Sequence, residues 1–207
     1  MDRARLDLGE IMNRTRRVSV LMVLALCAAV TVVAQESAAP TATFTTDMLA
    51  NFDRTGKKLL ALAEATPAEQ YAWAPSDAVR TMSEVYMHVV GTNVLLPMAL
   101  GAAPPEGLEV PEGGPFALLQ KWEQEVTAKD DVVARLKDSF EYASAAVPAI
   151  TDLETEVNLF GFPGTKRAYL LILLTHAHEH LGQAVAYARS VGVVPPWSQQ
   201  QGDGGGQ

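Results

Sequence analysis

The chain has 207 residues, of which 48% are hydrophobic and 19% charged, so its composition is that of a core-forming globular protein and not of a disordered one. The formal net charge is −8, with +2 on the first 34 residues and −10 on the remainder, and such an acidic surface disfavours binding to nucleic acid. The single cysteine, Cys27, excludes a disulfide framework.

The N-terminus has the pattern of an export signal. Three arginines within residues 14–17 precede an apolar stretch over residues 18–34, and small residues end at Ala34, where a signal peptidase would cut. We therefore expect residues 1–34 to be a signal peptide, residues 35–45 to be a linker, and the protein to be exported to the periplasm or secreted. The alternative is an uncleaved N-terminal helix that anchors the chain, because this apolar stretch is near the lower length limit for a membrane span.

Two helices are predicted in the first half of the remaining chain, where apolar residues recur at helical spacing. The first spans residues 46–65, and residues 66–75 form a short helical turn followed by an extended stretch. The second spans residues 81–100, and Pro97 is expected to bend or stop its last turn. Residues 101–114 are rich in glycine and proline and predict a long loop.

Two more helices are predicted in the second half. The third spans residues 115–142, with Phe116 on its buried face, and the fourth spans residues 165–191. The intervening residues are less regular, and none of them alternates clearly enough to predict a strand. Residues 198–207 are rich in glycine and glutamine and should be disordered. Residues 46–197 should therefore form an all-α domain, a four-helix bundle with a long crossover between its second and third helices.

The histidines are the candidate functional residues. His176 and His180 lie one turn apart on the same face of the last helix, His178 points away, and His88 lies within the apolar stripe of the second helix. Burying three unpartnered imidazoles would cost on the order of 1–3 kcal/mol each, whereas one divalent metal ion satisfies all three. Histidines hydrogen-bonded within the core are the open alternative, because such pairs also occur by chance. Glu84 could orient His88, although an exposed helix acid is the simpler interpretation.

Several catalytic motifs are absent. The sequence from His178 fails the His-Glu-x-x-His pattern, because Gly182 stands where the second histidine should be. The Glu-x-x-His pairs of di-iron bundles, a covalent haem motif, a phosphate-binding glycine loop and a serine nucleophile elbow are missing as well.

The pattern that remains resembles the DinB/YfiT-like superfamily, over roughly Thr46 to Trp197. In the second helix, the matching features are the midway histidine His88 and the lead-in residues Glu69 to Pro75. In the last helix, they are the motif His176-x-x-x-His180-x-Gly182-Gln183 and the ending Tyr187-Ala188-Arg189-x-x-Gly192-x-x-Pro195-Pro196. The resemblance implies a bundle with up-down-down-up connectivity and a divalent metal, zinc or nickel most often, held by His88, His176 and His180. Leu181 departs from the family, which often has arginine there, so no role of that arginine transfers.

Two functional hypotheses follow from this resemblance. The first is a metal-dependent hydrolase or transferase that acts outside the cytoplasm on a small molecule. Related S-transferases use thiols that are chiefly cytoplasmic, which fits an exported chain poorly. The second is a non-catalytic metal-binding or stress-related binding protein, and a bundle that has lost its metal is a third possibility. An open coordination position facing a reachable pocket would favour the enzyme. The helix faces leave room for a homodimer, and His178 and Glu179 are expected to be solvated.

Overall fold

The computed structural model describes residues 43–199. These residues form six α-helices, two single-turn 3-10 helices and one β-hairpin, in the order α2 (Phe44–Ala65), η1 (Ala68–Gln70), α3 (Met82–Ala99), α4 (Gly114–Glu125), α5 (Lys129–Ala146), η2 (Val147–Ala149), β1 (Glu156–Leu159), β2 (Phe162–Thr165), α6 (Lys166–Ser190) and α7 (Pro196–Gln199). The predicted signal peptide, most of the predicted linker and all but the first residues of the predicted tail lie outside the described residues. Among the described helices, none has both the length and the hydropathy needed to cross a bilayer.

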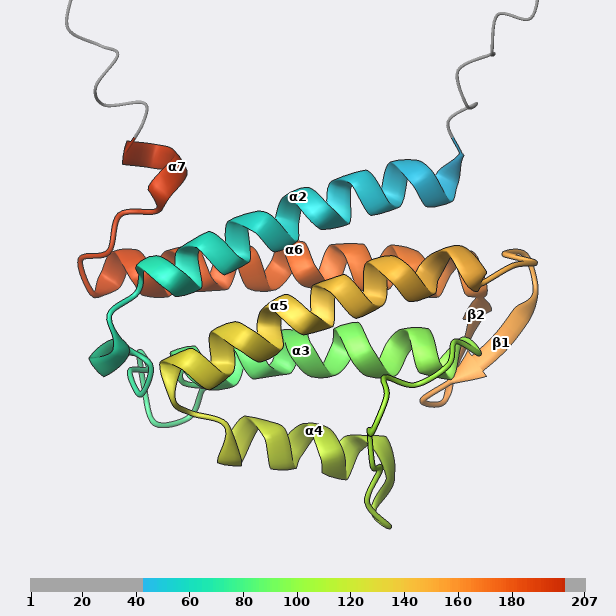
Figure 1. The fold of residues 1–207 in the computed structure, drawn as a ribbon, viewed down its shortest axis with the longest axis horizontal. Helices are drawn as coiled ribbons and strands as arrows, with labels where there is room; N and C mark the ends of the chain where they lie inside the picture. The colour runs from blue at the N-terminus through green and yellow to red at the C-terminus, as the bar shows by residue number, and fades with distance from the viewer. Residues whose placement is uncertain (1–42, 200–207) are drawn as a thin grey trace, which may run out of the picture. The chain divides into compact units, whose positions relative to one another are not determined.

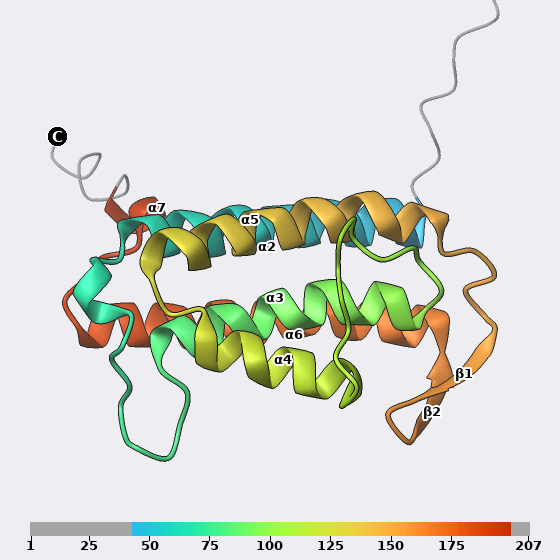
Figure 2. The ribbon, with the colours of Figure 1, turned by 60° about the horizontal axis from the view of Figure 1, so that its bottom comes forward.

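The four long helices form a bundle of two layers. Helices α2 and α5 make one layer, and α3 and α6 make the other, with α4 against the outer side of α3 (Figures 1 and 2). Helices α2 and α6 run in one direction, whereas α3 and α5 run in the other (Figure 1). In chain order this is an up-down-down-up arrangement, which requires the long crossover between α3 and α5 that contains α4.

Side-chain caps fix where the long helices begin. Thr43 and Thr46 form a capping box at the start of α2, and Thr81 and Glu84 form another at the start of α3. The side chain of Thr165 accepts a hydrogen bond from the backbone of Ala168 at the start of α6. Glu84 is thus a capping residue and not the partner of His88 that the sequence made conceivable.

The hydrophobic core lies between the two layers. Phe52 of α2 packs on Phe140 of α5 with ring centroids 4.8 Å apart, and Leu59 and Leu136 are fully buried beside them. Gly56 permits this close approach, because a Cβ atom there would lie only 2.6 Å from the ring of Phe140. Helix α3 is buried around most of its circumference, since α4, α5 and α6 all pack against it.

The predicted third helix is wrong in one respect, because it is two helices. Helix α4 ends at Glu125 and α5 begins at Lys129, with Val126 and Ala128 in non-helical conformations. Helix α4 covers α3 from outside, whereas α5 lies within the bundle, and one straight helix could not do both. Phe116 was also predicted to be buried, but its side chain is 62% exposed.

The region before α6 contains strands that the sequence did not predict. Strands β1 and β2 pair antiparallel with Leu159 opposite Phe162, which leaves a two-residue turn. Both turn residues, Phe160 and Gly161, have positive φ angles of 58° and 86°, as a type I′ hairpin turn requires. The hydroxyl of Tyr169 in α6 lies within hydrogen-bond distance of the backbone oxygens of Leu159 and Phe162 and accepts from the backbone N–H of Leu159, which fixes the hairpin beside the helix.

Candidate metal centre

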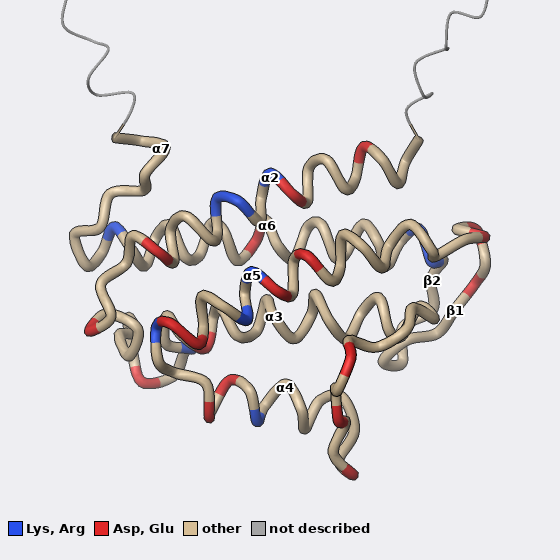
Figure 3. Tube along the Cα trace, in the orientation of Figure 1, with Lys and Arg blue, Asp and Glu red and all other residues tan. Residues whose placement is uncertain are grey.

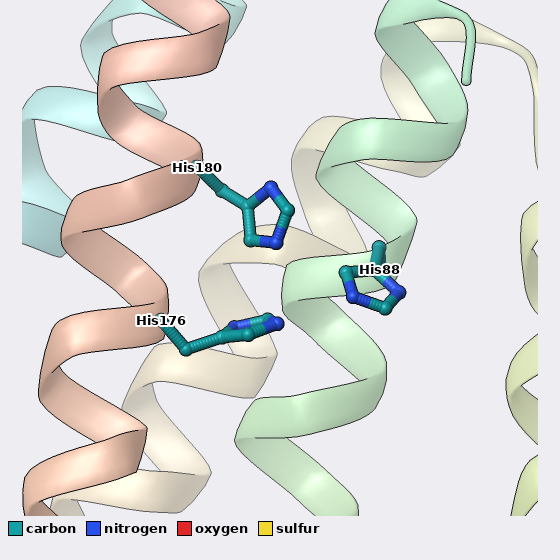
Figure 4. A group of neighbouring side chains, drawn as sticks. All are labelled: His88, His176 and His180. Atoms are coloured by element: carbon teal, nitrogen blue, oxygen red, sulfur yellow. The ribbon is translucent and has the colours of Figure 1, made fainter. Parts of the chain in front are cut away.

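The structure brings His88, His176 and His180 together between α3 and α6. Figure 4 shows the three rings pointing into one space, two from α6 and one from α3. The ring centroids are 5.0 Å apart for His88 and His176, 4.9 Å for His88 and His180, and 4.4 Å for the pair on α6. The one-turn spacing on α6 places two rings side by side, and the packing of α3 against α6 supplies the third.

The other residues of the last-helix motif face elsewhere. His178 is exposed and contacts the hydroxyl of Thr55 on α2 through Nε2 at 3.0 Å, and Nδ1 lies 3.0 Å from the carbonyl oxygen of Leu174. Glu179 is exposed as well. Neither residue belongs to the group of converging histidines.

His88 is oriented by Glu123 of α4, a residue that sequence reasoning missed. The imidazole Nδ1–H donates to Glu123 Oε1 at 2.7 Å, because a carboxylate can only accept. Arg80 donates to the other oxygen, Oε2, at 3.0 Å. Burial raises the pKa of Glu123, but the hydrogen bonds from His88 and Arg80 outweigh it and lower the pKa overall. An ionised carboxylate thus holds the proton on Nδ1 of His88, so that in the neutral ring the lone pair lies on Nε2.

His180 is oriented in the same way by a neutral group. Its Nδ1 lies 2.8 Å from Gln183 Oε1, an acceptor, and Gln183 Nε2 in turn donates to the hydroxyl of Tyr187 at 3.1 Å. This chain of contacts also leaves the Nε2 atom of His180 unprotonated. Burial lowers the pKa of His180, with nearby His88 acting in the same direction, so the ring is neutral near pH 7.

His176 is the least satisfied of the three. Its Nδ1 is buried and has no hydrogen-bond partner, and its Nε2 lies 3.3 Å from the hydroxyl of Thr92. Burial, together with the proximity of His180 and His88, lowers the pKa of His176 to about 3. A buried ring nitrogen without a hydrogen-bond partner is costly unless something binds it.

These side chains have the properties of metal ligands. Neutral imidazoles suit zinc, nickel, copper and iron, and ligand histidines usually donate their second ring nitrogen to a carboxylate or carbonyl oxygen, as His88 and His180 do here. One ligand nitrogen from each of the three lies within 4.8 Å of the others. In a tetrahedral zinc site with Zn–N distances of about 2.1 Å, the ligand nitrogens lie roughly 3.4 Å apart, so each ring needs to move inward by about an ångström to share an ion. The three histidines therefore could hold a divalent metal.

A cavity of about 480 Å³ adjoins the histidines. His88 and His176 form part of its wall, together with residues of α3, α4, α6 and the hairpin. Its rim reaches solvent, since Phe116 and Phe162 both line it and are largely exposed. A small molecule in the cavity would therefore touch the imidazoles directly.

Comparisons with known proteins agree with this arrangement. Residues 51–184, more than half of the chain, match the model of the DinB superfamily. A DinB-like protein from Bacillus cereus ATCC 10987 is similar in structure, with 17% identity, a TM-score of 0.59, and coverage of 72% of this chain and 93% of that one. No curated protein matched the chain.

Two Bacillus subtilis structures are similar as well. The DinB-like protein YjoA has 22% identity and a TM-score of 0.55 over 72% of this chain and 93% of its own. YfiT, described as a probable metal-dependent hydrolase with an unusual four-helix bundle topology, has 15% identity and a TM-score of 0.53 over 77% of this chain and 93% of its own. At these identities the likeness establishes the fold.

Proposed function

Because the chain belongs to the DinB superfamily, we propose that it is an exported metal-dependent enzyme, a hydrolase or transferase acting on a small molecule. His88, His176 and His180 would hold the ion, with zinc or nickel as the first candidates. The observation that carries the proposal is the convergence of three imidazoles on one space beside a cavity that reaches solvent. The description of YfiT as a probable metal-dependent hydrolase supports the same class of reaction.

The residues of the chain have distinct roles in this proposal. When bound, a divalent ion supplies Lewis acidity that brings the pKa of a water or thiol ligand towards neutrality. Glu123 and Gln183 hold the rings of His88 and His180 in the tautomer that offers Nε2. The Thr92 hydroxyl, which lines the cavity, is a hydrogen-bond donor for the polar end of a substrate. Among the cavity-lining residues there is no carboxylate, so a proton would have to move through water or a histidine.

The alternative function is a non-catalytic metal-binding or stress-related binding protein. A structural metal site is usually closed by four protein ligands, whereas a catalytic site keeps a position open. Within residues 43–199, the group contains three such side chains and no fourth. Together with the adjoining cavity, this favours the enzyme. Export is proposed from the N-terminal sequence alone, with an uncleaved anchor as its alternative.

Metal content tests the proposal directly. The wild type, His176→Ala and His178→Ala are reconstituted with zinc and with nickel, and bound metal is measured by elemental analysis. The control is His178→Ala, which makes the same histidine-to-alanine change on the same helix as the test variant. We expect about one ion per chain in the wild type and in this control. The His176→Ala variant should lose the ion. A wild type that binds neither metal would refute the metalloenzyme.

A further inference from the structure

We propose that the substrate of the three-histidine site is a molecule whose larger part is apolar and which carries no charge away from the group that meets the ion, seated between α3, α4, α6 and the β-hairpin. This inference rests on the proposed function and adds the substrate class. The cavity is walled mainly by apolar side chains, among them Leu95, Leu96, Phe116, Leu119, Phe162 and Ile172. Its volume of about 480 Å³ is within the range of roughly 300–1,000 Å³ that ligand pockets occupy.

No charged side chain is available to a ligand in this cavity. None of the lining residues is a lysine, arginine, aspartate or glutamate. Helix α3 has no such residue after Glu84, and α6 has none between Arg167 and Glu179, as the uncharged stretches in Figure 3 show. Away from the three histidines, where the proposed ion would supply the only positive charge, a carboxylate or phosphate in the cavity would lose its hydration without gaining a counter-charge, which is strongly unfavourable.

The cations Arg80, Lys166 and Arg167 already have partners. Arg80 donates to Glu123, and Arg167 pairs with Glu154 while its guanidinium lies 4.9 Å from the ring of Phe44. Lys166 donates to the carbonyl oxygen of Thr151 at 3.3 Å. None of these three residues lines the cavity. Thiols that carry several carboxylates, and other polyanions, are therefore poor candidates for the substrate.

The polar groups of the wall are concentrated at the histidines. The imidazole of His176 lies 5.0 Å from that of His88 between ring centroids, and its Nε2 lies 3.3 Å from the hydroxyl of Thr92. Tyr169 also lines the cavity, but its hydroxyl is used by the backbone of the hairpin. A substrate would thus place its reacting polar group, such as an ester, amide or epoxide, at the histidines and its apolar part towards the hairpin.

The hairpin turn gives an independent indication that the mouth of the cavity is built to be apolar. Phe160 occupies a position with φ of 58°, where asparagine or glycine is the usual residue. Its ring lies 5.1 Å from that of Phe116 in an edge-to-face contact, and this pair joins the hairpin to α4 over the cavity. Phe162, 72% exposed, extends the same apolar rim. Positive φ is unfavourable for an aromatic residue, so we attribute the presence of Phe160 at this turn position to its contact with Phe116.

Binding of the neutral apolar fluorophore N-phenyl-1-naphthylamine tests the proposal. The full chain, in the form that the expressing cell delivers, is stripped of metal with a chelator, so that the result does not depend on the ion. The test variant is Ile172→Gln, on the cavity wall and 47% exposed, and the control is Leu171→Gln, the neighbouring residue on α6, 48% exposed and outside the wall. Both side chains are partly solvated, so both variants should fold.

We expect the wild type to bind the fluorophore and Ile172→Gln to bind it about tenfold more weakly, the loss expected from about two apolar methylene contacts. Leu171→Gln should stay within about twofold of the wild type. Competition then tests charge: 1-octanol should displace the fluorophore at a concentration at least about tenfold below that of octanoate, which has the same chain length. Octanoate competing as well as the alcohol, or Leu171→Gln losing as much as Ile172→Gln, would overturn the proposed substrate class.

Failure of this inference is distinguishable from failure of the proposed function. Zinc binding is measured on the same variants, and Ile172→Gln should bind zinc as the wild type does, because Ile172 contributes no ligand. Normal zinc binding without fluorophore binding would overturn the apolar substrate and leave the metalloenzyme. Fluorophore binding without zinc or nickel binding would overturn the metalloenzyme, and with it any catalytic role for the cavity.

Discussion

Replacing Glu123 by glutamine should weaken metal binding without removing any ligand. The glutamine keeps the shape of the side chain, so the change is the charge of the atom that accepts from His88 Nδ1, now 2.7 Å away. A carboxylate makes this imidazole a better electron donor at Nε2 and holds the ring in one tautomer. The Glu123 side chain is 14% exposed, so water screens the interaction little.

The size of the effect can be bounded. A hydrogen bond to a charged group contributes about 1.5–3 kcal/mol, against about 0.5–1.5 kcal/mol for a neutral pair. Loss of an outer partner of a ligand histidine typically reduces metal affinity about 10- to 100-fold, equivalent to about 1.4–2.7 kcal/mol. We therefore expect the dissociation constant for zinc to rise by that factor in Glu123→Gln. Arg80 loses its partner as well, but it is partly exposed and water can solvate it.

The assay is a competitive zinc titration against a chromophoric chelator at pH 8, where imidazoles of ordinary pKa are neutral and do not bind protons. Glu125→Gln is the matched control, since Glu125 lies on the same helix but is exposed and makes only a distant ion pair with Lys121 at 3.9 Å. That variant should bind zinc like the wild type. An unchanged zinc affinity in Glu123→Gln, or an equal loss in both variants, would refute the role assigned to Glu123.

Two further predictions concern stability. In the metal-free protein, His176 stays neutral when folded, with a pKa of about 3, but protonates with an ordinary pKa near 6.5 when unfolded, so acid favours the unfolded state. This residue alone should lower the free energy of unfolding by about 2 kcal/mol between pH 7 and pH 5. Urea titrations should show that the free energy of unfolding of His176→Leu falls less than that of the wild type between pH 7 and pH 5. An equal fall in both proteins would contradict the role given to His176. Gly56→Ala, whose new Cβ would lie 2.6 Å from Phe140, should lose about 1–3 kcal/mol. Gly182→Ala, with nothing within 4 Å of its Cβ, should gain about 0.5–1 kcal/mol, and thermal unfolding that ranks the two glycine variants in the opposite order would contradict the packing described here.

Helical periodicity in the sequence predicted the four long apolar helices and the burial around the histidines, whereas the resemblance to the superfamily implied the connectivity and the grouping of His88 with His176 and His180. His176 and His180 are four residues apart and so share a face of the helix wherever it begins. The apolar residues around them and around His88 predict that all three side chains are at least partly buried. Glu123 could not be found in this way. It lies 35 residues from His88, on a helix whose place against α3 depends on the whole fold. Gln183 was within the motif, but its role became visible only with the contact to His180.

The errors have physical causes as well. Leu118 and Leu136 are both buried and lie 18 residues apart, which equals about five helical turns, so periodicity continues across the break between α4 and α5 without a change of phase. The hairpin was missed because its turn contains Phe160, a residue type that seldom adopts positive φ. Phe116 was predicted to be buried because apolar residues usually are, whereas here it lines the rim of a cavity.

The position of α4 outside the two layers has an evolutionary consequence. Helix α4 contributes Glu123 to His88 and Phe116 and Leu119 to the cavity, whereas Leu118 is its one buried residue. Mutations in α4 can therefore alter ligand basicity and cavity shape while the residues that determine folding stay unchanged. A protein built in this way can diverge in substrate preference at little cost in stability, and α4 is the segment to randomise in a library that seeks new substrates.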